Sequence, residues 1–191
     1  MSTIRGTSLP ERRTTESLSD PPADLRAAMR LFPTGVALLS TGHGKQAIAT
    51  TINAVMSVSL SPPQLLISVL RTSRAQPVLE ATGTFSINLL TAEQADLARL
   101  FATSAKPVGA ALAAHLQPRT VDGHTCHVLP GSLATMSCTV RTSYPGGDHD
   151  LFLGHVDHVL PGAAEHAPLV FHHGRLVGGT HDRSAGTHTD R

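Results

Sequence analysis

Aromatic residues are scarce in this sequence, which has five Phe, one Tyr and no Trp among 191 residues. Proteins that hold single-stranded nucleic acid commonly stack its bases on aromatic side chains. Fifteen Lys and Arg nearly balance fourteen Asp and Glu, which leaves a formal charge of +1. No broad cationic surface is then available for a nucleic-acid backbone or an anionic membrane. We therefore expect neither nucleic acid nor a membrane among the partners.

Cysteine and long apolar runs are also scarce. Cys126 and Cys138 are the two cysteines, and they provide no framework of disulfides. The first residues lack the apolar run of a secretory signal, and no window approaches the roughly 20 apolar residues of a membrane span. These features predict a soluble protein of the reducing cytoplasm.

The length fits one domain. Ser, Thr, Arg and Pro dominate residues 1–22 without hydrophobic periodicity, and residues 180–191 resemble them. Such composition cannot bury enough apolar surface to fold. We expect a disordered N-terminal tail over 1–22, a folded domain over 23–179 and a flexible C-terminal tail over 180–191.

Hydrophobic patterns within 23–179 predict mostly strands. Apolar residues at spacings of three and four follow Asp24 and predict a short helix that Pro33 ends. A capping box from Thr91 to Gln94 predicts a second helix containing Phe101. We predict loop with one helical turn for 104–131. Strands are expected at 36–40, 47–51, 64–70, 84–90, 133–142, 151–160 and 169–171.

These strands form hairpins, because turn residues such as those at 42–45 and 145–148 separate them. Strands in hairpins with a few peripheral helices are typical of a mainly β protein. A closed or nearly closed antiparallel barrel is favoured, since it also avoids exposed strand edges.

The segment from residue 29 to 70 combines small hydroxyl and amide residues with turn-forming prolines and has few long charged side chains. It contains F-P-T-G-V at 32–36, T-I-N at 51–53 and S-V-S-L-S-P-P at 57–63. A surface of this kind suits hydrogen bonding to a flat ligand with polar edges.

Taken in order, these segments resemble the flavin reductase-like family, over about residues 25–177. The resemblance continues with R-T-S at 71–73, G-T-F-S-I-N-L-L at 83–90, L-A-R-L-F-A at 97–102, G-D-H-D-L-F-L-G-H-V at 147–156 and P-L-V-F-H-H-G-R-L at 168–176. It implies the FMN-binding split barrel, a split antiparallel β-barrel with a few peripheral helices. It also implies a homodimer with the flavin cleft at the subunit seam.

The resemblance implies which residues lie along a bound FMN or FAD. The ring would contact Pro33, Thr34, Thr51, Ile52 and Asn53, and the ring edge or ribityl chain would contact Ser57, Val58 and Ser59. Ala54 stands where the family often has Ser, which could shift affinity or the choice between FMN and FAD. Independently, a flavin needs donors at its carbonyl and N5 edges, and backbone amides beside small polar residues provide them. The alternative is that these are ordinary strand and turn residues.

Further cofactor-binding candidates lie outside this segment. Arg71, Thr72, Ser73 and Arg74 follow an apolar strand, and Ser73 could begin a helix whose amides point toward the flavin phosphate. The alternative is a solvated loop with two cations. Phe101, in the L-A-R-L-F-A segment, is a further cofactor-binding candidate. The resemblance implies that Arg175, in the C-terminal segment, helps to close the flavin pocket or the dimer seam.

His149 is the catalytic candidate. The resemblance implies that it lies near the flavin and nicotinamide, where it would position NADH or NADPH or assist protonation of reduced flavin. The alternative is a surface turn residue.

Two histidine groups look superficially like metal ligands: His124-x-Cys126-His127 and His155-x-x-His158. On a regular strand, His155 and His158 would face opposite sides of the sheet. We therefore expect no metal site.

The leading hypothesis is an NAD(P)H:flavin oxidoreductase that passes hydride from NADH or NADPH to flavin N5. Reduced flavin would then diffuse to a partner monooxygenase or halogenase. Two alternatives are an oxidoreductase with tightly bound flavin acting on another substrate, and a non-catalytic flavin-binding or interaction module.

Overall fold

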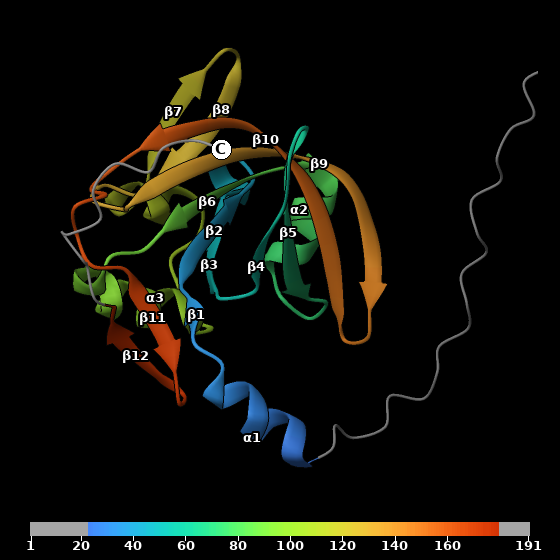
Figure 1. Cartoon of the computed structure of the whole chain (residues 1–191). Coiled ribbons are helices and arrows are strands. Elements are labelled where there is room, and N and C mark those ends of the chain that lie inside the picture. Colours follow the sequence, from blue (N-terminus) through green and yellow to red (C-terminus); the bar gives the residue numbers. More distant parts are fainter. Residues whose placement is uncertain (1–22, 180–191) are drawn as a thin grey trace, which may run out of the picture.

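The computed structural model describes residues 23–179, and the expected tails at 1–22 and 180–191 lie outside this range. Strands dominate it (Figure 1). The helices are α1 (Ala23–Leu31), η1 (Gly44–Gln46), α2 (Ala75–Thr82), η2 (Ala92–Gln94), α3 (Ala95–Ala102) and η3 (Gly109–Ala114). The strands are β1 (Thr34–Gly35), β2 (Ala37–Thr41), β3 (Ile48–Ile52), β4 (Val55–Leu60), β5 (Pro63–Leu70), β6 (Thr84–Leu89), β7 (Gln117–Val121), β8 (His124–Val128), β9 (Ala134–Gly146), β10 (His149–Pro161), β11 (Leu169–His172) and β12 (Arg175–Gly178).

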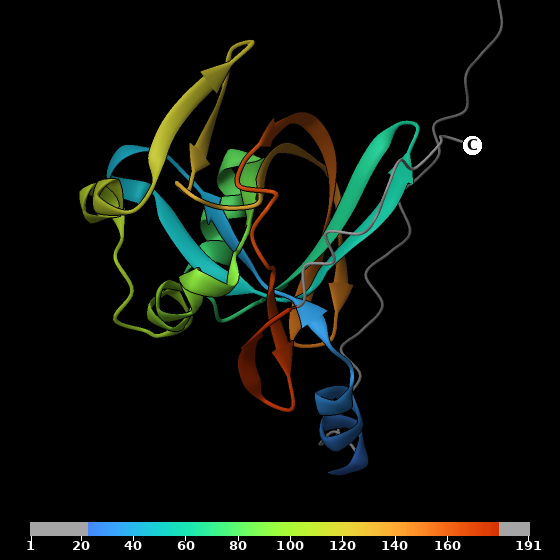
Figure 2. The same cartoon turned by 60° about the vertical axis from the view of Figure 1, so that its left-hand side comes forward.

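Seven strands form one antiparallel sheet in the order β3-β2-β6-β9-β10-β5-β4. The sheet curls into a barrel, as Figures 1 and 2 show. Its two edges, β3 and β4, follow each other in the chain but do not pair, so the barrel is split between them. The predicted split antiparallel barrel is confirmed, and only Asn53 and Ala54 join the two edges.

Apolar side chains pack on both faces of this sheet. Ala37 and Leu39 of β2 point into the barrel, where Ile67, Phe85 and Phe152 also lie. Leu38 points the other way, into a second cluster that α3 and η3 cover. All five residues of β2 are buried because both of its faces are covered.

Strand β6 carries polar residues on its outer face, and the β7–β8 hairpin explains them. Asn88 is completely buried, and its amide donates to the His127 carbonyl (3.1 Å) while its carbonyl accepts from Leu129 N (2.8 Å) and Thr135 Oγ1 (2.7 Å). Ser86 Oγ accepts from His127 N at 3.1 Å. Side chains of β6 thus form the hydrogen bonds that backbone groups of β8 and the residue after it need where the hairpin packs against the sheet.

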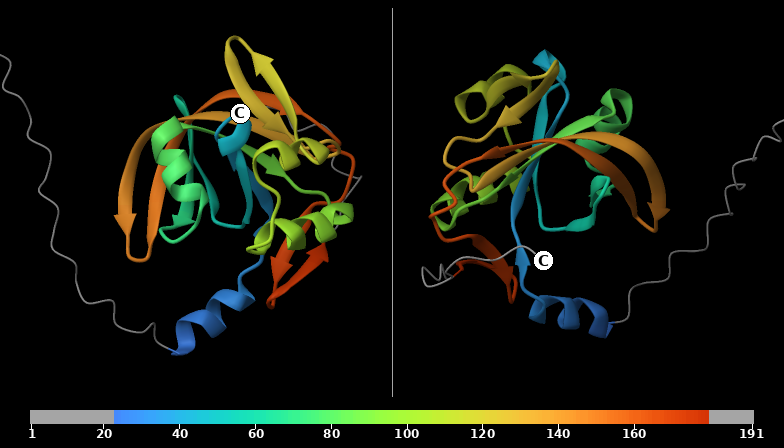
Figure 3. Two further views of the ribbon diagram at one scale, coloured as in Figure 1. Left: turned by 180° about the vertical axis from the view of Figure 1, so that it is seen from behind. Right: turned by 45° about the horizontal axis from the view of Figure 1, so that its top comes forward.

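The predicted loop over 104–131 is wrong in its second half. β7 and β8 pair there, from Gln117 opposite Val128 to Val121 opposite His124. Asp122 and Gly123 both have positive φ, of 47° and 81°. An Asp-Gly pair between strand-forming residues is a strong hairpin signal, so the turn was present in the sequence but not recognised. The hairpin rises from the barrel (Figure 3).

The predicted helices are present, and β1, η1, β4 and β12 were not predicted. Thr91 N donates to Gln94 Oε1 at 3.1 Å, as the capping box requires, although η2 precedes α3. α1 stands apart from the barrel, and Leu25, Met29 and Phe32 are more than half exposed (Figure 1). The strand β4 and the helix α2 lie where the sequence analysis placed no strand and only a possible helix start.

His155 and His158 lie on the same face of β10, contrary to the expectation from a regular strand. His155 pairs with Thr139 and His158 with Ser137, and these partners share one face of β9. A bulge between Val156 and His158 causes this, because one extra residue reverses the alternation. Within residues 23–179, no three His, Cys, Asp or Glu side chains are arranged to hold a metal ion. No helix in this range is long and apolar enough to cross a membrane.

Candidate functional site

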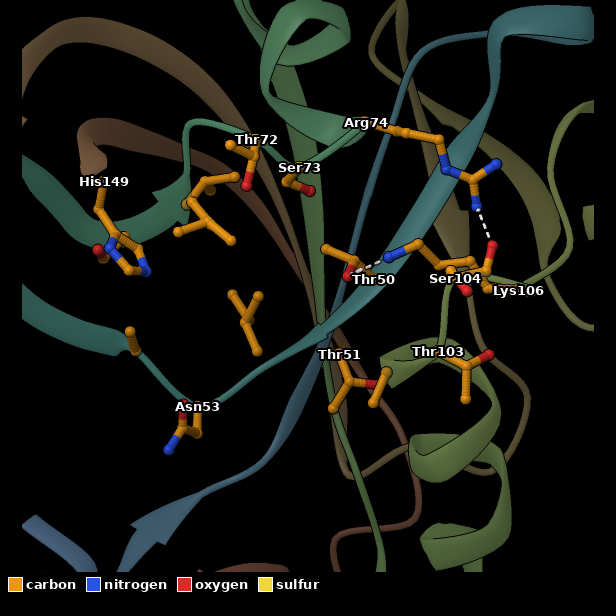
Figure 4. Close-up of a pocket in the computed structure, with 16 residues that line it drawn as sticks. Thr50, Thr51, Asn53, Thr72, Ser73, Arg74, Thr103, Ser104, Lys106 and His149 are labelled. Atoms are coloured by element: carbon orange, nitrogen blue, oxygen red, sulfur yellow. Dashed lines mark hydrogen bonds between the residues drawn. The ribbon is translucent and has the colours of Figure 1, made fainter. Parts of the chain in front are cut away.

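An open cleft of about 500 Å³ lies where the barrel splits (Figure 4). Three parts of the chain enclose it: the end of β3 with its exit, the end of β5 with the start of α2, and the loop after α3. His149, at the start of β10, completes it. Its lining consists of Thr50, Thr51, Ile52, Asn53, Ala54, Ser68, Val69, Leu70, Thr72, Ser73, Arg74, Ala102, Thr103, Ser104, Lys106 and His149.

The wall formed by β3 presents backbone groups. β3 pairs with β2 on one side only, because it is an edge of the sheet. In the part of the chain that the structure describes, its second edge pairs only through an isolated bridge between Ile48 and Val108. Unpaired N–H and C=O groups at a strand edge are ready to bond a ligand. The cleft therefore contains donors and acceptors that belong to the backbone.

The β3 side chains anchor this wall to α3. Thr51 Oγ1 donates to the Ala98 carbonyl at 2.7 Å, and Thr50 Oγ1 lies 3.5 Å from the Phe101 carbonyl. The Phe101 carbonyl lies in the last turn of α3, where helices leave acceptors without intrahelical partners. The hydroxyls of Thr50 and Thr51 thus hold α3 against the edge strand and keep the cleft wall in place.

Arg74 and Lys106 form a cationic end of the cleft. Arg74 Nη2 donates to the Ser104 carbonyl at 2.8 Å, and Lys106 Nζ donates to Thr50 Oγ1 at 2.8 Å (Figure 4). Within residues 23–179, neither cation forms an ion pair with a carboxylate. Burial, followed by the positive charge of Arg74, lowers the pKa of the Lys106 ammonium. An anion placed here would offset both effects.

His149 lies at the other end of the cleft (Figure 4). It is the first residue of β10 and pairs with Leu70 of β5 and Gly146 of β9. Its side chain is 39% exposed, and its Nδ1 lies 2.6 Å from Asp148 Oδ1. The imidazole is therefore accessible from the cleft.

The structure brings seven of the predicted site residues into the cleft. They are Thr51, Ile52, Asn53, Ala54, Ser73, Arg74 and His149. Thr34 lies just outside, and its Oγ1 accepts from Asn53 Nδ2 at 3.1 Å. Pro33, Ser57 and Val58 are exposed outside the cleft, and half-buried Ser59 directs its Oγ to Ser61 N at 3.2 Å.

Three predicted residues lie away from the cleft for identifiable reasons. Arg71 Nε pairs with Asp150 Oδ1 at 3.0 Å, so its guanidinium is engaged on the other face of β10 from His149. Phe101 is completely buried and packs edge-on against His115, so its ring belongs to the core. Arg175 begins β12 opposite His172, in the small sheet with β1 and β11.

Lys106 is the most informative residue that the sequence analysis missed. It is one of two lysines in the chain and stands between the end of α3 and Pro107. Its rarity and its position after the L-A-R-L-F-A segment were the available signals. Thr103 and Ser104 were missed as well, because nothing local distinguishes them from other loop hydroxyls.

The chain belongs to the flavin reductase like domain family, whose model matches residues 29–180. It is 41% identical over 152 residues to the NADH-dependent FMN reductase AsuE2 of Streptomyces nodosus subsp. asukaensis, covering 79% of this chain and 81% of that one. It is 37% identical over 139 residues to the actinorhodin polyketide dimerase of Streptomyces coelicolor, covering 71% and 74%. The structure of BorF, the flavin reductase component of a bacterial two-component tryptophan halogenase, matches with a TM-score of 0.76 at 28% identity, covering 83% of this chain and 98% of BorF.

Proposed function

We propose that the protein is an NAD(P)H-dependent flavin reductase that passes electrons from NADH or NADPH to FMN or FAD. The observation that carries the proposal is the cleft at the barrel split. It combines a free strand edge, an accessible imidazole and two cations that pair with no carboxylate of residues 23–179. Family membership and the similarity to AsuE2 support the same reaction.

The donor set of the cleft fits a flavin. The free edge of β3, with Asn53 beside it, offers hydrogen bonds to the polar edges of a planar ring, and among the residues that the structure describes no Phe or Tyr lines the cleft. When bound, the flavin supplies the ring that accepts the hydride. The contribution of this chain is to hold the ring and the nicotinamide in register. His149, at the open end, is the residue proposed to position the nicotinamide.

Arg74 and Lys106 are proposed to hold the flavin phosphate, together with the hydroxyl of Ser73. A phosphate monoester carries nearly two negative charges at neutral pH and offers three strong acceptors. The two cations lie at the cationic end of the cleft, opposite His149, so a phosphate bound there would direct the rest of the ligand toward the imidazole. Arg71 is proposed to contribute less to phosphate binding than Arg74 and Lys106, because its guanidinium is paired with Asp150.

Reduced flavin is proposed to leave the cleft and reach a partner monooxygenase or halogenase. The cleft is open, and Asn53 and Ala54 in its wall are exposed, so ligand exchange needs no large movement. BorF, a reductase component of a two-component halogenase, is an example of such a division of labour in a similar structure.

We also propose a homodimer. α1 exposes Leu25 and Met29, and β4 exposes Met56, Val58 and Leu60, the last of these at 89%. Two such apolar surfaces on one chain favour burial against a second copy. Ser57, Val58, Ser59, Pro33 and Arg175 would then contact flavin only through that assembly. The cytoplasm is the proposed location, because Cys126 and Cys138 are both buried free thiols.

A second candidate is an oxidoreductase with tightly bound flavin that acts on another substrate. The 37% identical relative named a polyketide dimerase favours keeping it. A non-catalytic flavin-binding module is the remaining alternative.

The decisive experiment follows the nicotinamide absorbance of NADH or NADPH with purified protein and added FMN or FAD. The flavin reductase is expected to oxidise one of the nucleotides rapidly and only when free flavin is added. Flavin that stays with the protein through gel filtration and is not bleached by NADH would favour the second candidate. Saturable flavin binding without any oxidation would favour the binding module.

A further inference from the structure

The backbone on both sides of His149 is held in place. Arg71 N donates to the Asp148 carbonyl at 2.9 Å, which ties the tip of the β9–β10 hairpin to the end of β5. On the following residue, Asp150 accepts from Arg71 Nε and from Gln76 Nε2, both at 3.0 Å. These contacts fix the Cα of His149 at the cleft. They leave the imidazole free to turn about its own side-chain bonds.

Asp148 supplies the contact that the ring itself needs. Its Oδ1 lies 2.6 Å from His149 Nδ1, a distance typical of a charge-assisted hydrogen bond. That hydrogen bond is the main reason why the pKa of the Asp148 carboxyl is lowered, so the carboxylate is ionised at neutral pH. An ionised carboxylate only accepts hydrogen bonds. The proton of a neutral His149 ring is therefore held on Nδ1.

The two nitrogens of the imidazole then have different roles. With Nδ1 donating to Asp148, Nε2 is the nitrogen left to interact with a ligand. His149 lines the cleft, whereas Asp148 does not. Asp148 thus lies behind the ring, where it orients the imidazole without reaching the ligand.

We propose that Asp148 is a positioning residue that holds His149 in the Nδ1-protonated form with Nε2 available to the cleft. This inference rests on the proposed function, in which His149 positions the nicotinamide. If Asp148 and His149 formed only an exposed ion pair, that pair would contribute little to the stability of the protein, since both side chains are solvent-accessible. Measurements of activity and of the histidine tautomer can therefore distinguish a positioning role of Asp148 from a simple surface ion pair.

The first experiment is a double-mutant cycle on flavin-dependent NADH oxidation. Asp148→Ala is expected to lower kcat/KM for the nucleotide about tenfold, the effect of one charge-assisted hydrogen bond, without changing the affinity for flavin. The His149→Gln variant keeps a polar side chain at the cleft but has no imidazole ring for Asp148 to orient. In this background, Asp148→Ala is expected to change kcat/KM less than twofold. Asp148→Glu should recover part of the loss. Asp96→Ala, which removes another exposed carboxylate from an ion pair on α3, is the matched control.

The second experiment measures the protonation of the two His149 ring nitrogens directly. Nitrogen NMR of the full chain, labelled in its histidines, is expected to show His149 protonated on Nδ1 at a pH where the ring is neutral, and to lose this preference in Asp148→Ala. An unchanged tautomer would overturn the proposal, as would an equal effect of Asp148→Ala in the wild-type and His149→Gln backgrounds. If the wild-type protein oxidises no NADH, the proposed function fails, whereas the NMR measurement still decides whether Asp148 orients His149.

Discussion

Two clusters of Ser, Thr and Asn side chains lie in different parts of the same curled sheet, one on β6 and one at the exit of β3, and they differ in how many of their hydrogen bonds are made within the chain. Asn88 is completely buried, and its amide is hydrogen-bonded within the chain, to Thr135 and to backbone groups that include the β8 carbonyl of His127. Around Asn53, the side chain is exposed and makes one hydrogen bond, to Thr34. The same residue types therefore stabilise the fold in one cluster and remain available to a ligand in the other.

The energetic consequence follows from burial. A buried polar group that loses its partner keeps the full cost of its desolvation, whereas an exposed one exchanges a partner for water. Substitutions in the Asn88 cluster should therefore affect stability, and substitutions in the cleft should affect binding. The three experiments below test this separation.

Asn88→Ala is expected to have the largest effect. It removes four hydrogen bonds, and it takes from the Leu129 amide and the His127 carbonyl their Asn88 partner and leaves the Thr135 hydroxyl only the longer contact to Ser132 Oγ at 3.4 Å. The free energy of unfolding should fall by about 3 to 5 kcal/mol. Thermal denaturation should show a midpoint lower by roughly 10 °C. A midpoint within a degree of the wild type would mean that β8 is held by other contacts.

Lys106→Met is expected to weaken FMN binding at least about tenfold while leaving riboflavin binding unchanged, because riboflavin lacks the phosphate. Lys45→Met, at the other lysine of the chain, is the matched control. Fluorescence titration with both flavins measures the ratio of the FMN affinity to the riboflavin affinity. Equal weakening for FMN and riboflavin would show that Lys106 acts on the fold of the cleft rather than on the phosphate.

The same titrations have a pH dependence with a definite sign. Phosphate binding needs the ammonium form of Lys106, so this part of the FMN affinity is present below the pKa of Lys106 and is lost as the pH rises through it. Burial and Arg74 lower that pKa. The loss should therefore begin at a lower pH than for an exposed lysine, and Lys106→Met should abolish it.

Asn53→Ala is expected to have the smallest effect and provides the direct counterpart of Asn88→Ala. Flavin affinity should fall about fivefold, the value of one neutral hydrogen bond. The free energy of unfolding should change by less than about 0.5 kcal/mol, because Asn53 is exposed. Flavin titration and thermal denaturation of the same sample measure both quantities. A large loss of stability would remove the distinction between the two clusters.

Much of the barrel was predictable from hydrophobic alternation and turn residues. The strands at 36–40, 47–51, 64–70 and 84–90 and the long β9–β10 pair were placed correctly, because apolar periodicity is a local property. β4 was missed although Met56, Val58 and Leu60 alternate with Ser57 and Ser59, a pattern that is typical of a strand. The β7–β8 hairpin was missed although Asp122-Gly123 is a local turn signal.

The site was predictable in its strand-exit half and less so elsewhere. Thr51 to Ala54 line the cleft as expected, since they directly join the two edges of the split sheet. Phe101 was assigned to the cofactor because its segment resembles the family, but helix periodicity directs its ring into the core. Its neighbours Ala102 and Thr103 face the cleft instead.

The sequence by itself determined the class of fold, the family and the segment around Asn53, because these depend on short-range patterns and on the order of motifs. Only the tertiary structure decided that Lys106 and Arg74 lie at the same end of the cleft and that Arg71 forms an ion pair with Asp150. It also decided that His155 and His158 lie on the same face of β10. Those outcomes depend on how the sheet curls and where it bulges. Curling and bulging arise from contacts between residues far apart in the chain.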